Sequence, residues 1–392
     1  MRTRMLGLMA VGALVGPIGM AATADPEPDA FALPDVNLDG IGDLAVLRDQ
    51  PIRVEIRSGS NGALLGTVPF LGPSFAPLTA TAMGDLDGDG AAEVAVLARR
   101  TSDDRGVVEI RDVTNAPPAR QVWFAADHTP VAVAVIEGDA DGNGVPEVAV
   151  LSRRNSDGRG LVEVKNAYGT TNPVSIWAGA GLTPLDLEVV NDADQNGVPE
   201  VAVLSSRDSD GRIVVEVKNA AGPTNPNAVW FMAGNSAIDL TVVGDADGNS
   251  VPEVAVLSSR NSDGRIVTEV KNASGPTNPT AVWFMAGQTG LAVEALGDAD
   301  GNGVAELAVL SRRNSDGRVL VEVKNAAGAT APRSLWYPAG YAARDLTILP
   351  DLDGNGIVEA GALLTRDSDG RILVEGRNAA GPQSPRDYWF SP

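Results

Sequence analysis

The stretch GDADGNGVPEVAVL, residues 138–151, decides the fold because close copies of it recur along the chain. Four similar copies start at residues 84, 191, 244 and 297, and two more divergent ones start at residues 34 and 350. The first aspartates of the seven copies lie 50 to 54 residues apart, at Asp35, Asp85, Asp139, Asp192, Asp245, Asp298 and Asp351. Self-similarity at a fixed period of this length indicates a repeat architecture in which each copy is one structural unit.

Each copy contains the pattern of four short β-strands. In the fifth copy we expect them at residues 238–244, 251–258, 265–271 and 281–285. Asp263-Gly264 separates the second strand from the third, and Asp-Gly readily adopts the positive φ angles of a tight hairpin. The second strand is almost wholly apolar, which is expected when both of its faces are covered.

Seven units of four strands predict an all-β protein, a seven-bladed β-propeller of four-stranded antiparallel blades. A β-sandwich would not repeat its sequence so regularly, and a nonapeptide solenoid has a much shorter period. We expect a lead-in segment at residues 25–33 and one propeller domain at residues 34–392. The expected blades span approximately residues 34–76, 77–130, 131–183, 184–236, 237–289, 290–342 and 343–392.

Residues 1–24 have the order of a secretory signal peptide. Arg2 and Arg4 precede an apolar stretch at residues 5–20, and Ala22-Thr23-Ala24 matches a cleavage site. The apolar stretch is shorter than the ~18 to 20 residues that a membrane span needs. We therefore expect a mature chain without a transmembrane segment, which is secreted, periplasmic or at the cell surface after cleavage near Ala24.

The composition excludes several classes of function. The chain has no cysteine, which rules out disulfides, cysteine nucleophiles and cysteine metal sites. His128 is the single histidine, so a multi-histidine metal centre is also excluded. The net charge of −21 argues against binding to nucleic acid, whose phosphates require clusters of Lys and Arg.

The repeated loop DxDGNGxxE has the chemistry of a calcium site. It places side-chain oxygens at positions 1, 3, 5 and 9, and a glycine at position 6 that permits a sharp turn. Calcium prefers six to eight oxygen ligands, among them a backbone carbonyl and a last carboxylate that binds through both oxygens. The alternative is a set of plain polar turns, in which Asp, Asn and Gly are common. However, carboxylates packed so closely repel one another unless a cation lies between them.

We therefore expect up to seven Ca²⁺ sites. The expected side-chain ligands, loop by loop, are Asp35, Asn37, Asp39 and Asp43; Asp85, Asp87, Asp89 and Glu93; Asp139, Asp141, Asn143 and Glu147; Asp192, Asp194, Asn196 and Glu200; Asp245, Asp247, Asn249 and Glu253; Asp298, Asp300, Asn302 and Glu306; and Asp351, Asp353, Asn355 and Glu359. The expected carbonyl ligands at position 7 are Ile41, Ala91, Val145, Val198, Val251, Val304 and Ile357.

These loops resemble those of the FG-GAP and VCBS repeats, a family that includes the propeller of integrin α-chains. The motif DxDxDGxxD followed by an apolar strand carries the resemblance, which spans essentially the whole mature chain. It implies a seven-bladed propeller with calcium between the first two strands of a blade. The chain departs from the family pattern by Glu at position 9 in six loops and Asn at position 5 in five. Ser250 replaces the glycine at position 6 of the fifth loop, whose site we expect to be the weakest.

The strand order places the turns between the second and third strands on the face opposite the acidic loops, together with the connectors between blades. The connectors differ most between copies, at residues 127–129, 181–183, 235–236, 288–289 and 341–342. Exposed loops on a rigid scaffold often bind ligands, although for any single residue simple sequence drift is the preferred explanation of the variation. The resemblance to integrin-like propellers also implies that ligands bind on this face.

Two repeated residue types near this face have alternative interpretations. Six tryptophans recur at Trp123, Trp177, Trp230, Trp283, Trp336 and Trp389, with Phe70 in the corresponding place of the first copy. They form either a sugar-stacking ring or, as we expect from their fixed place in a strand, packing contacts between blades. Five arginines form either a basic ring for an anionic ligand or local pairs with turn aspartates, namely Arg154 with Asp157, Arg207 with Asp210, Arg260 with Asp263, Arg313 with Asp316 and Arg366 with Asp369.

We expect a non-catalytic adhesion, scaffold or recognition module that binds a protein or glycan on the face opposite the calcium loops. The alternative is a polysaccharide-active enzyme, a lyase or hydrolase built on a propeller. An enzyme normally carries an asymmetric group of residues that breaks the repeat, and the sequence offers no catalytic residues and no organic cofactor site of that kind.

Overall fold

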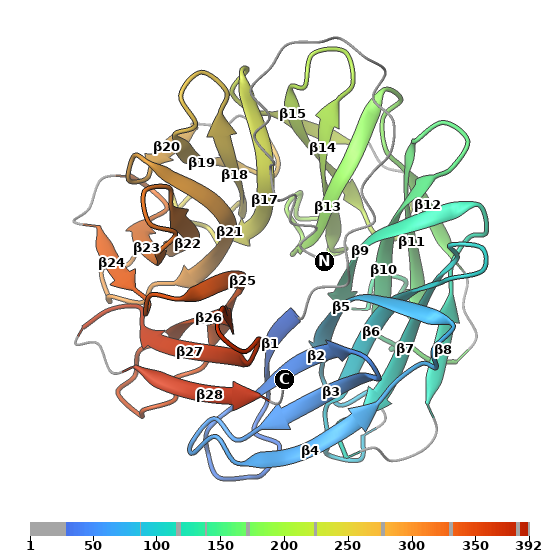
Figure 1. Ribbon diagram of the computed structural model, residues 1–392. Helices are drawn as coiled ribbons and strands as arrows, with labels where there is room; N and C mark the ends of the chain where they lie inside the picture. The colour runs from blue at the N-terminus through green and yellow to red at the C-terminus, as the bar shows by residue number, and fades with distance from the viewer. Residues whose placement is uncertain are drawn as a thin grey trace.

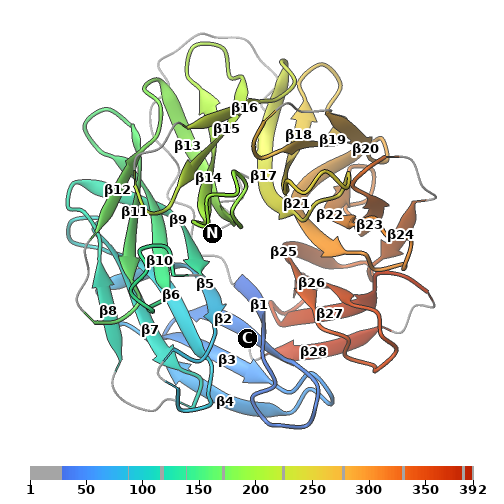
Figure 2. The same cartoon turned by 180° about the vertical axis from the view of Figure 1, so that it is seen from behind.

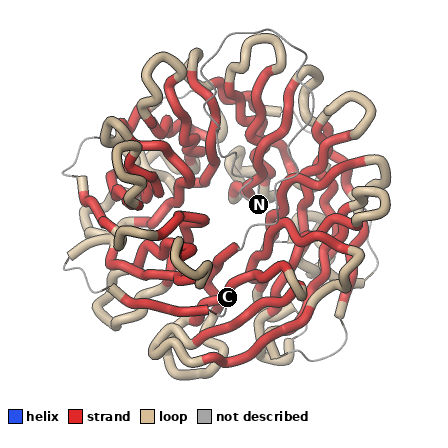
Figure 3. Tube along the Cα trace, viewed as in Figure 1, coloured by secondary structure: helices blue, strands red, loops and turns tan. Residues whose placement is uncertain are grey.

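The structure is a computed structural model. It describes residues 29–86, 88–114, 119–137, 139–169, 173–222, 226–275, 279–328, 332–381 and 385–390. The expected signal peptide and residues 25–28 of the lead-in segment lie outside these ranges. The described residues form seven four-stranded sheets in a ring, which confirms the expected seven-bladed propeller (Figure 1). Figure 2 shows the same ring from behind, and Figure 3 shows that its described parts are strands and loops.

The four strands of each blade pair antiparallel in sequence order, from the axis of the ring to its rim. The innermost strands are β1(Asp29–Leu33), β5(Phe75–Met83), β9(His128–Ile136), β13(Leu182–Val190), β17(Asn235–Val243), β21(Gln288–Gly297) and β25(Tyr341–Leu349). The second strands are β2(Asp43–Asp49), β6(Glu93–Arg100), β10(Glu147–Arg154), β14(Glu200–Arg207), β18(Glu253–Arg260), β22(Glu306–Arg313) and β26(Glu359–Arg366). The third strands are β3(Ile52–Arg57), β7(Gly106–Asp112), β11(Gly160–Asn166), β15(Ile213–Asn219), β19(Ile266–Asn272), β23(Val319–Asn325) and β27(Ile372–Asn378). The outer strands are β4(Leu64–Pro69), β8(Arg120–Trp123), β12(Val174–Trp177), β16(Asn227–Trp230), β20(Thr280–Trp283), β24(Arg333–Trp336) and β28(Arg386–Phe390).

The innermost strands begin earlier than the sequence pattern indicated. Strand β1 starts at Asp29, within the expected lead-in segment, and pairs with β2. In blade five, β17 starts at Asn235 rather than at residue 238, because a β-bulge between Ala237 and Asp239 lets pairing continue to Arg260. One extra residue in a bulge breaks the alternation of side chains by which a strand is recognised.

The hydrophobic core consists of slabs between neighbouring blades, which explains why the second strands are apolar on both faces. In β2, Ala45 and Leu47 pack in the slab shared with blade two. Leu44 and Val46, on the other face of the same strand, pack in the slab shared with blade seven. Burying both faces of a strand removes its side chains from water and stabilises the ring in proportion to the apolar area covered.

The ring closes by packing between blades one and seven, without a strand shared between their sheets. Strand β28, which contains Trp389, pairs with β27 and completes blade seven. The Tyr388 hydroxyl donates to the carbonyl of Gly59 in blade one over 2.6 Å. Arg386 donates to the carbonyl of Ser60 over 3.1 Å. Closure therefore combines the apolar slab with direct hydrogen bonds across the seam.

No helix in the described ranges is long and apolar enough to cross a membrane.

Candidate metal centre

Each acidic loop joins the first strand of a blade to the second and is organised by its own side chains. In blade three, both carboxylate oxygens of Asp139 accept backbone N–H groups, from Asn143 over 2.8 Å and from Gly144. The Asn143 side chain accepts the N–H of Val145 over 2.8 Å. Gly144 has a φ of 81°, a left-handed conformation that glycine adopts without strain. The loop is therefore folded tightly around the side chains at positions 1 and 5.

The glutamate at position 9 is buried in blades three to seven, and half of its carboxylate lacks a partner. Its Oε2 accepts the backbone N–H of position 2, over 3.2 Å from Ala140 to Glu147 and 2.7 Å from Ala193 to Glu200. Its Oε1 is buried without a hydrogen-bond partner in all five blades, in Glu147, Glu200, Glu253, Glu306 and Glu359. A buried oxygen of this kind costs about 1 to 3 kcal/mol, more when charged, unless something binds it.

Three carboxylates converge in each of the same five loops. One ligand oxygen from each of the residues at positions 1, 3 and 9 lies within 4.8 Å of the other two. The five groups are Asp139, Asp141 and Glu147; Asp192, Asp194 and Glu200; Asp245, Asp247 and Glu253; Asp298, Asp300 and Glu306; and Asp351, Asp353 and Glu359. The structure thus brings together fifteen of the expected side-chain ligands in five equal arrangements.

Burial opposes ionisation of these glutamates. It raises the pKa of Glu147, Glu200, Glu253 and Glu359 to about 7, and it also raises the pKa of Glu306. The two aspartate charges of the same loop raise each pKa further. Three carboxylates with an unpartnered buried oxygen are the donor set that a hard divalent cation requires, so these residues fit Ca²⁺.

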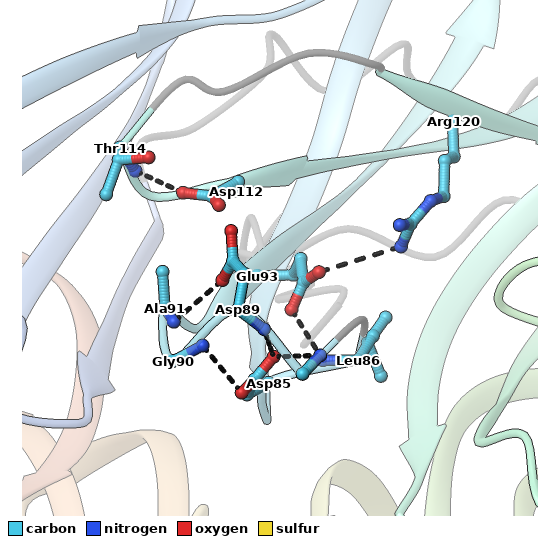
Figure 4. A network of polar contacts seen from close by, with 10 residues as sticks. Asp85, Leu86, Asp89, Gly90, Ala91, Glu93, Asp112, Thr114 and Arg120 are labelled. Carbon is cyan, nitrogen blue, oxygen red and sulfur yellow. Dashed lines mark hydrogen bonds and ion pairs between the residues drawn. The ribbon is translucent and has the colours of Figure 1, made fainter.

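The first two loops differ from the other five. In blade one both oxygens of Asp43 are used by backbone donors, over 2.8 Å from Val36 and 3.0 Å from Gly59. In blade two Glu93 accepts the N–H of Leu86 over 2.9 Å. Its other oxygen faces Arg120 at 3.6 Å (Figure 4).

Oε1 of Glu93 therefore has a cationic partner, whereas the corresponding glutamate oxygen in blades three to seven has no hydrogen-bond partner. Asp87 of the second loop lies outside the described residues, and the carbonyl ligands expected at position 7 stay a prediction in all seven loops.

On the opposite face, the variable residues proposed as exposed connectors are largely strand residues. His128, Leu182, Asn235 and Gln288 are each the first residue of an innermost strand and are buried. His128 packs against Trp177 with ring centroids 6.0 Å apart. One residue of each of these four connectors is therefore buried, because the bulged strand continues to the edge of the blade. Their neighbours in the same connectors are exposed, namely Asp127, Gly181, Ser236 and Thr289.

The arginines of this face form the local pairs. Arg154 donates through Nε and a terminal nitrogen to both oxygens of Asp157, and the same bidentate pair recurs in blades two to seven. Both partners remain partly exposed, at 34% and 46% of their side chains in blade three. Each pair is consequently a turn-stabilising contact with modest energy.

The tryptophans pack against arginines of their own blade. Arg154 and Arg159 lie over the ring of Trp177 at 4.7 and 5.1 Å, and blades two to seven repeat this arrangement. Rings covered in this way favour packing over sugar stacking. In blade one, Pro69 holds the register place of these tryptophans, opposite Arg53, so Phe70 corresponds to the residue after each tryptophan.

A cavity of about 410 Å³ lies along the innermost strands. Its lining includes five carboxylates, those of Asp29, Glu137, Glu188, Glu294 and Asp345. Sequence reasoning missed this group because its members come from different blades. The available signal was position within the innermost strand, since Asp29 corresponds in register to Asp345, and Glu188 to Glu294.

Fold and loops define the protein as a seven-bladed β-propeller with an acidic loop between the first two strands of its blades. Residues 35–96, which include the first two acidic loops, match the family model described as FG-GAP-like repeat. The resemblance to FG-GAP repeats that the loop motif indicated is therefore confirmed.

Solved structures share the fold at low sequence identity. A prolyl endopeptidase matches 91% of this chain and 48% of its own with a TM-score of 0.55 and 15% identity. Prolyl oligopeptidase B from Galerina marginata matches 92% of this chain and 51% of its own with a TM-score of 0.53 and 10% identity. An apocarotenoid oxygenase variant from Synechocystis matches 79% of this chain and 71% of its own with a TM-score of 0.51 and 12% identity. The chain thus spans about half the length of the two prolyl peptidases, and these likenesses concern the fold alone. No curated protein sequence matches the chain.

Proposed function

We propose that the protein is an exported, calcium-binding β-propeller that acts as a non-catalytic binding, adhesion or scaffold module for a protein or glycan. The observation that carries the calcium assignment is the buried, unpartnered Oε1 of Glu147, Glu200, Glu253, Glu306 and Glu359, each beside two aspartates. We therefore propose five calcium sites of one kind, in blades three to seven, instead of the seven sites expected from the sequence. In blades one and two, backbone N–H groups and Arg120 already satisfy the position-9 carboxylate.

Calcium stabilises the fold in this proposal, in a chain that has no disulfides. Extracellular-type sites have dissociation constants of about 10⁻⁴ M, so about 1 mM calcium stabilises the protein by roughly 1.4 kcal/mol per site. Five sites then contribute on the order of 7 kcal/mol, which is comparable with the net stability of a typical domain.

Chelation is the direct test. We expect excess EGTA to lower the melting temperature by more than 10 °C, and calcium, but not the same concentration of sodium, to restore it. Isothermal titration of the metal-free protein should give five equivalents of similar affinity. An unchanged melt in EGTA, with no heat on calcium addition, contradicts the assignment.

The binding role is tested by screening the calcium-loaded protein against glycan arrays and surface proteins, with metal-free protein as the control. We expect binding that disappears when calcium is removed, because the metal holds the blades in register.

An enzymatic role is the second candidate, and the carboxylates of the axial cavity favour it as the place where catalysis would reside. Turnover of a polysaccharide that is lost in Glu188→Gln, with the melting temperature unchanged, supports that candidate and overturns the non-catalytic role.

A further inference from the structure

The third strand of each blade ends directly beside the acidic loop. In blade four, Asn219 at the end of β15 is paired in register with Glu200, the position-9 residue at the start of β14. The same pairing joins the corresponding residues in blades three, five, six and seven. Residues opposite each other in an antiparallel pair project to the same face, with their Cβ atoms about 4.5 to 5.5 Å apart. The end of the third strand is therefore part of the wall around the three carboxylates.

Direct contacts in two blades show the side chain at this place reaching the loop, and in a third blade the side chain lies beside the loop. In blade one, Ser58 donates to Asp39 Oδ2 over 3.3 Å. In blade seven, Asn378 Nδ2 donates to Asp353 Oδ2 over 3.4 Å. Figure 4 shows the same place in blade two, where Asp112 lies beside the loop with its carboxyl group turned toward Asp89.

The residue at this place varies together with the type of loop. It is asparagine in blades three to seven, the blades in which three carboxylates converge among the described residues, and it is Ser58 in blade one and Asp112 in blade two. The asparagines are 1 to 6% exposed and are Asn166, Asn219, Asn272, Asn325 and Asn378. We call them the third-strand asparagines.

Blade four indicates what the asparagine does. At the acidic loop and the adjoining end of its third strand, three oxygens are buried without a hydrogen-bond partner, namely Asp192 Oδ1, Glu200 Oε1 and Asn219 Oδ1. All three are acceptors, so they cannot satisfy one another, and each buried acceptor left alone costs about 1 to 3 kcal/mol. One cation bound among them satisfies all three.

We propose that the third-strand asparagines supply a further oxygen ligand to the cation held by the acidic loop, an inference that rests on the proposed calcium sites. The loop alone offers oxygens at positions 1, 3, 5, 7 and 9, while Ca²⁺ takes six to eight. An amide oxygen from outside the loop raises the coordination number without adding a fourth charge. In blade seven, rotation of the Asn378 amide exchanges its nitrogen for its oxygen beside Asp353.

The consequence is that the metal joins the loop to the third strand of the blade. Each site then ties three strands together, the two that flank the loop and the one that supplies the asparagine. This arrangement explains how calcium stabilises a whole blade rather than one hairpin.

The test counts calcium ions bound to single-residue variants by native mass spectrometry and isothermal titration. For the wild-type protein we expect five equivalents. Asn219→Ala should weaken one of the five about 10- to 100-fold, the effect typical of residues around a metal. Asn219→Asp keeps the oxygen and should retain all five. If the amide served only as a hydrogen-bond donor to the loop carboxylates, Asn219→Asp would lose a site as well, and the ligand role would be overturned.

Two controls keep the outcomes separate. Asn155→Ala replaces an exposed asparagine in the turn on the opposite face and should keep five equivalents. Asn325→Ala in blade six repeats the test should Asn219→Ala fail to fold, as judged by its circular-dichroism spectrum. Wild-type protein that binds no calcium contradicts the proposed function itself. Five unchanged equivalents in both alanine variants contradict this inference alone.

Discussion

Single residues in the acidic loops have energetic roles that the motif does not reveal. Ser250 occupies position 6 of the fifth loop and has a φ of 67°, in the left-handed region. The equivalent residue of the sixth loop, Gly303, has a φ of 85°. Its N–H still donates to Asp245 Oδ2 over 2.7 Å, so the loop keeps its shape at the cost of backbone strain. A side chain in this conformation costs about 1 to 2 kcal/mol.

We expect Ser250→Gly to stabilise the protein by about 0.5 to 1 kcal/mol, since glycine removes the strain but gains freedom in the unfolded chain. Urea unfolding at fixed calcium measures the change. The reciprocal substitution Gly303→Ser should destabilise by a similar amount. Equal stability of all three proteins contradicts the strain argument.

The position-9 glutamates give the metal-free protein an unusual pH dependence. Their pKa in the folded protein is about 7 in four blades, above the ordinary value of 4.5. Between these two pH values the folded state binds protons that the unfolded state does not, so this contribution to stability is full below pH 4.5. It is lost as the pH rises through 7.

We therefore expect metal-free protein to have a larger free energy of unfolding at pH 5.5 than at pH 7.5. The gain in melting temperature on adding calcium should show the opposite trend, because protons compete with the cation. Replacing Glu147, Glu200, Glu253 and Glu359 by Gln should flatten the metal-free profile. A profile that rises with pH in the metal-free wild type contradicts the assignment.

At the scale of elements, neighbouring innermost strands are linked by carboxylates placed just after the β-bulge. Asp239 in β17 accepts the N–H of Val293 in β21 over 2.9 Å, within the buried interface of blades five and six. Asp186 holds the same place in β13, yet its Oδ2 is buried without a partner. Burial, and next the charge of Asp239, raise the pKa of Asp186 well above its ordinary value.

Substitution of these two aspartates should therefore have different effects on stability. Asp239→Ala leaves the Val293 N–H unpaired and should destabilise by about 1 to 3 kcal/mol. Asp186→Asn removes an unfavourable buried charge and should leave stability at pH 7 unchanged or higher. Thermal unfolding of the two variants measures both changes in stability. A larger loss of stability in Asp186→Asn than in Asp239→Ala would contradict the different roles of the two aspartates.

At the scale of the molecule, the ring depends on the seam between its first and last blades. Tyr388 bonds to Gly59 across this seam, whereas Tyr337 makes the comparable bond from blade six to Ala360 in blade seven over 3.2 Å. We expect Tyr388→Phe to destabilise by about 1 kcal/mol. It should also speed hydrogen exchange in both β1 and β28, since the two blades separate together. Tyr337→Phe should leave exchange in β1 unchanged, and equal effects of both variants on β1 would contradict a distinct seam.

The architecture could be predicted from the sequence because it is encoded locally and repeated. The period of the acidic motif specified the number of blades, the apolar second strands indicated cover on both faces, and Asp-Gly marked the hairpins. The same locality explains why the carboxylates converge in the loops of blades three to seven, because residues within nine positions on a tight turn lie close together. The resemblance to FG-GAP repeats and the propeller fold could therefore be predicted from the sequence alone.

The tertiary structure alone decided the features that depend on segments far apart in the chain. The pairing of Glu200 with Asn219, the ion pair of Glu93 with Arg120, and the seam at Tyr388 all join residues from different strands. So does the group of carboxylates in the axial cavity. Spacing along a chain does not determine such pairs, because they result from strand register and from the packing of one blade on the next.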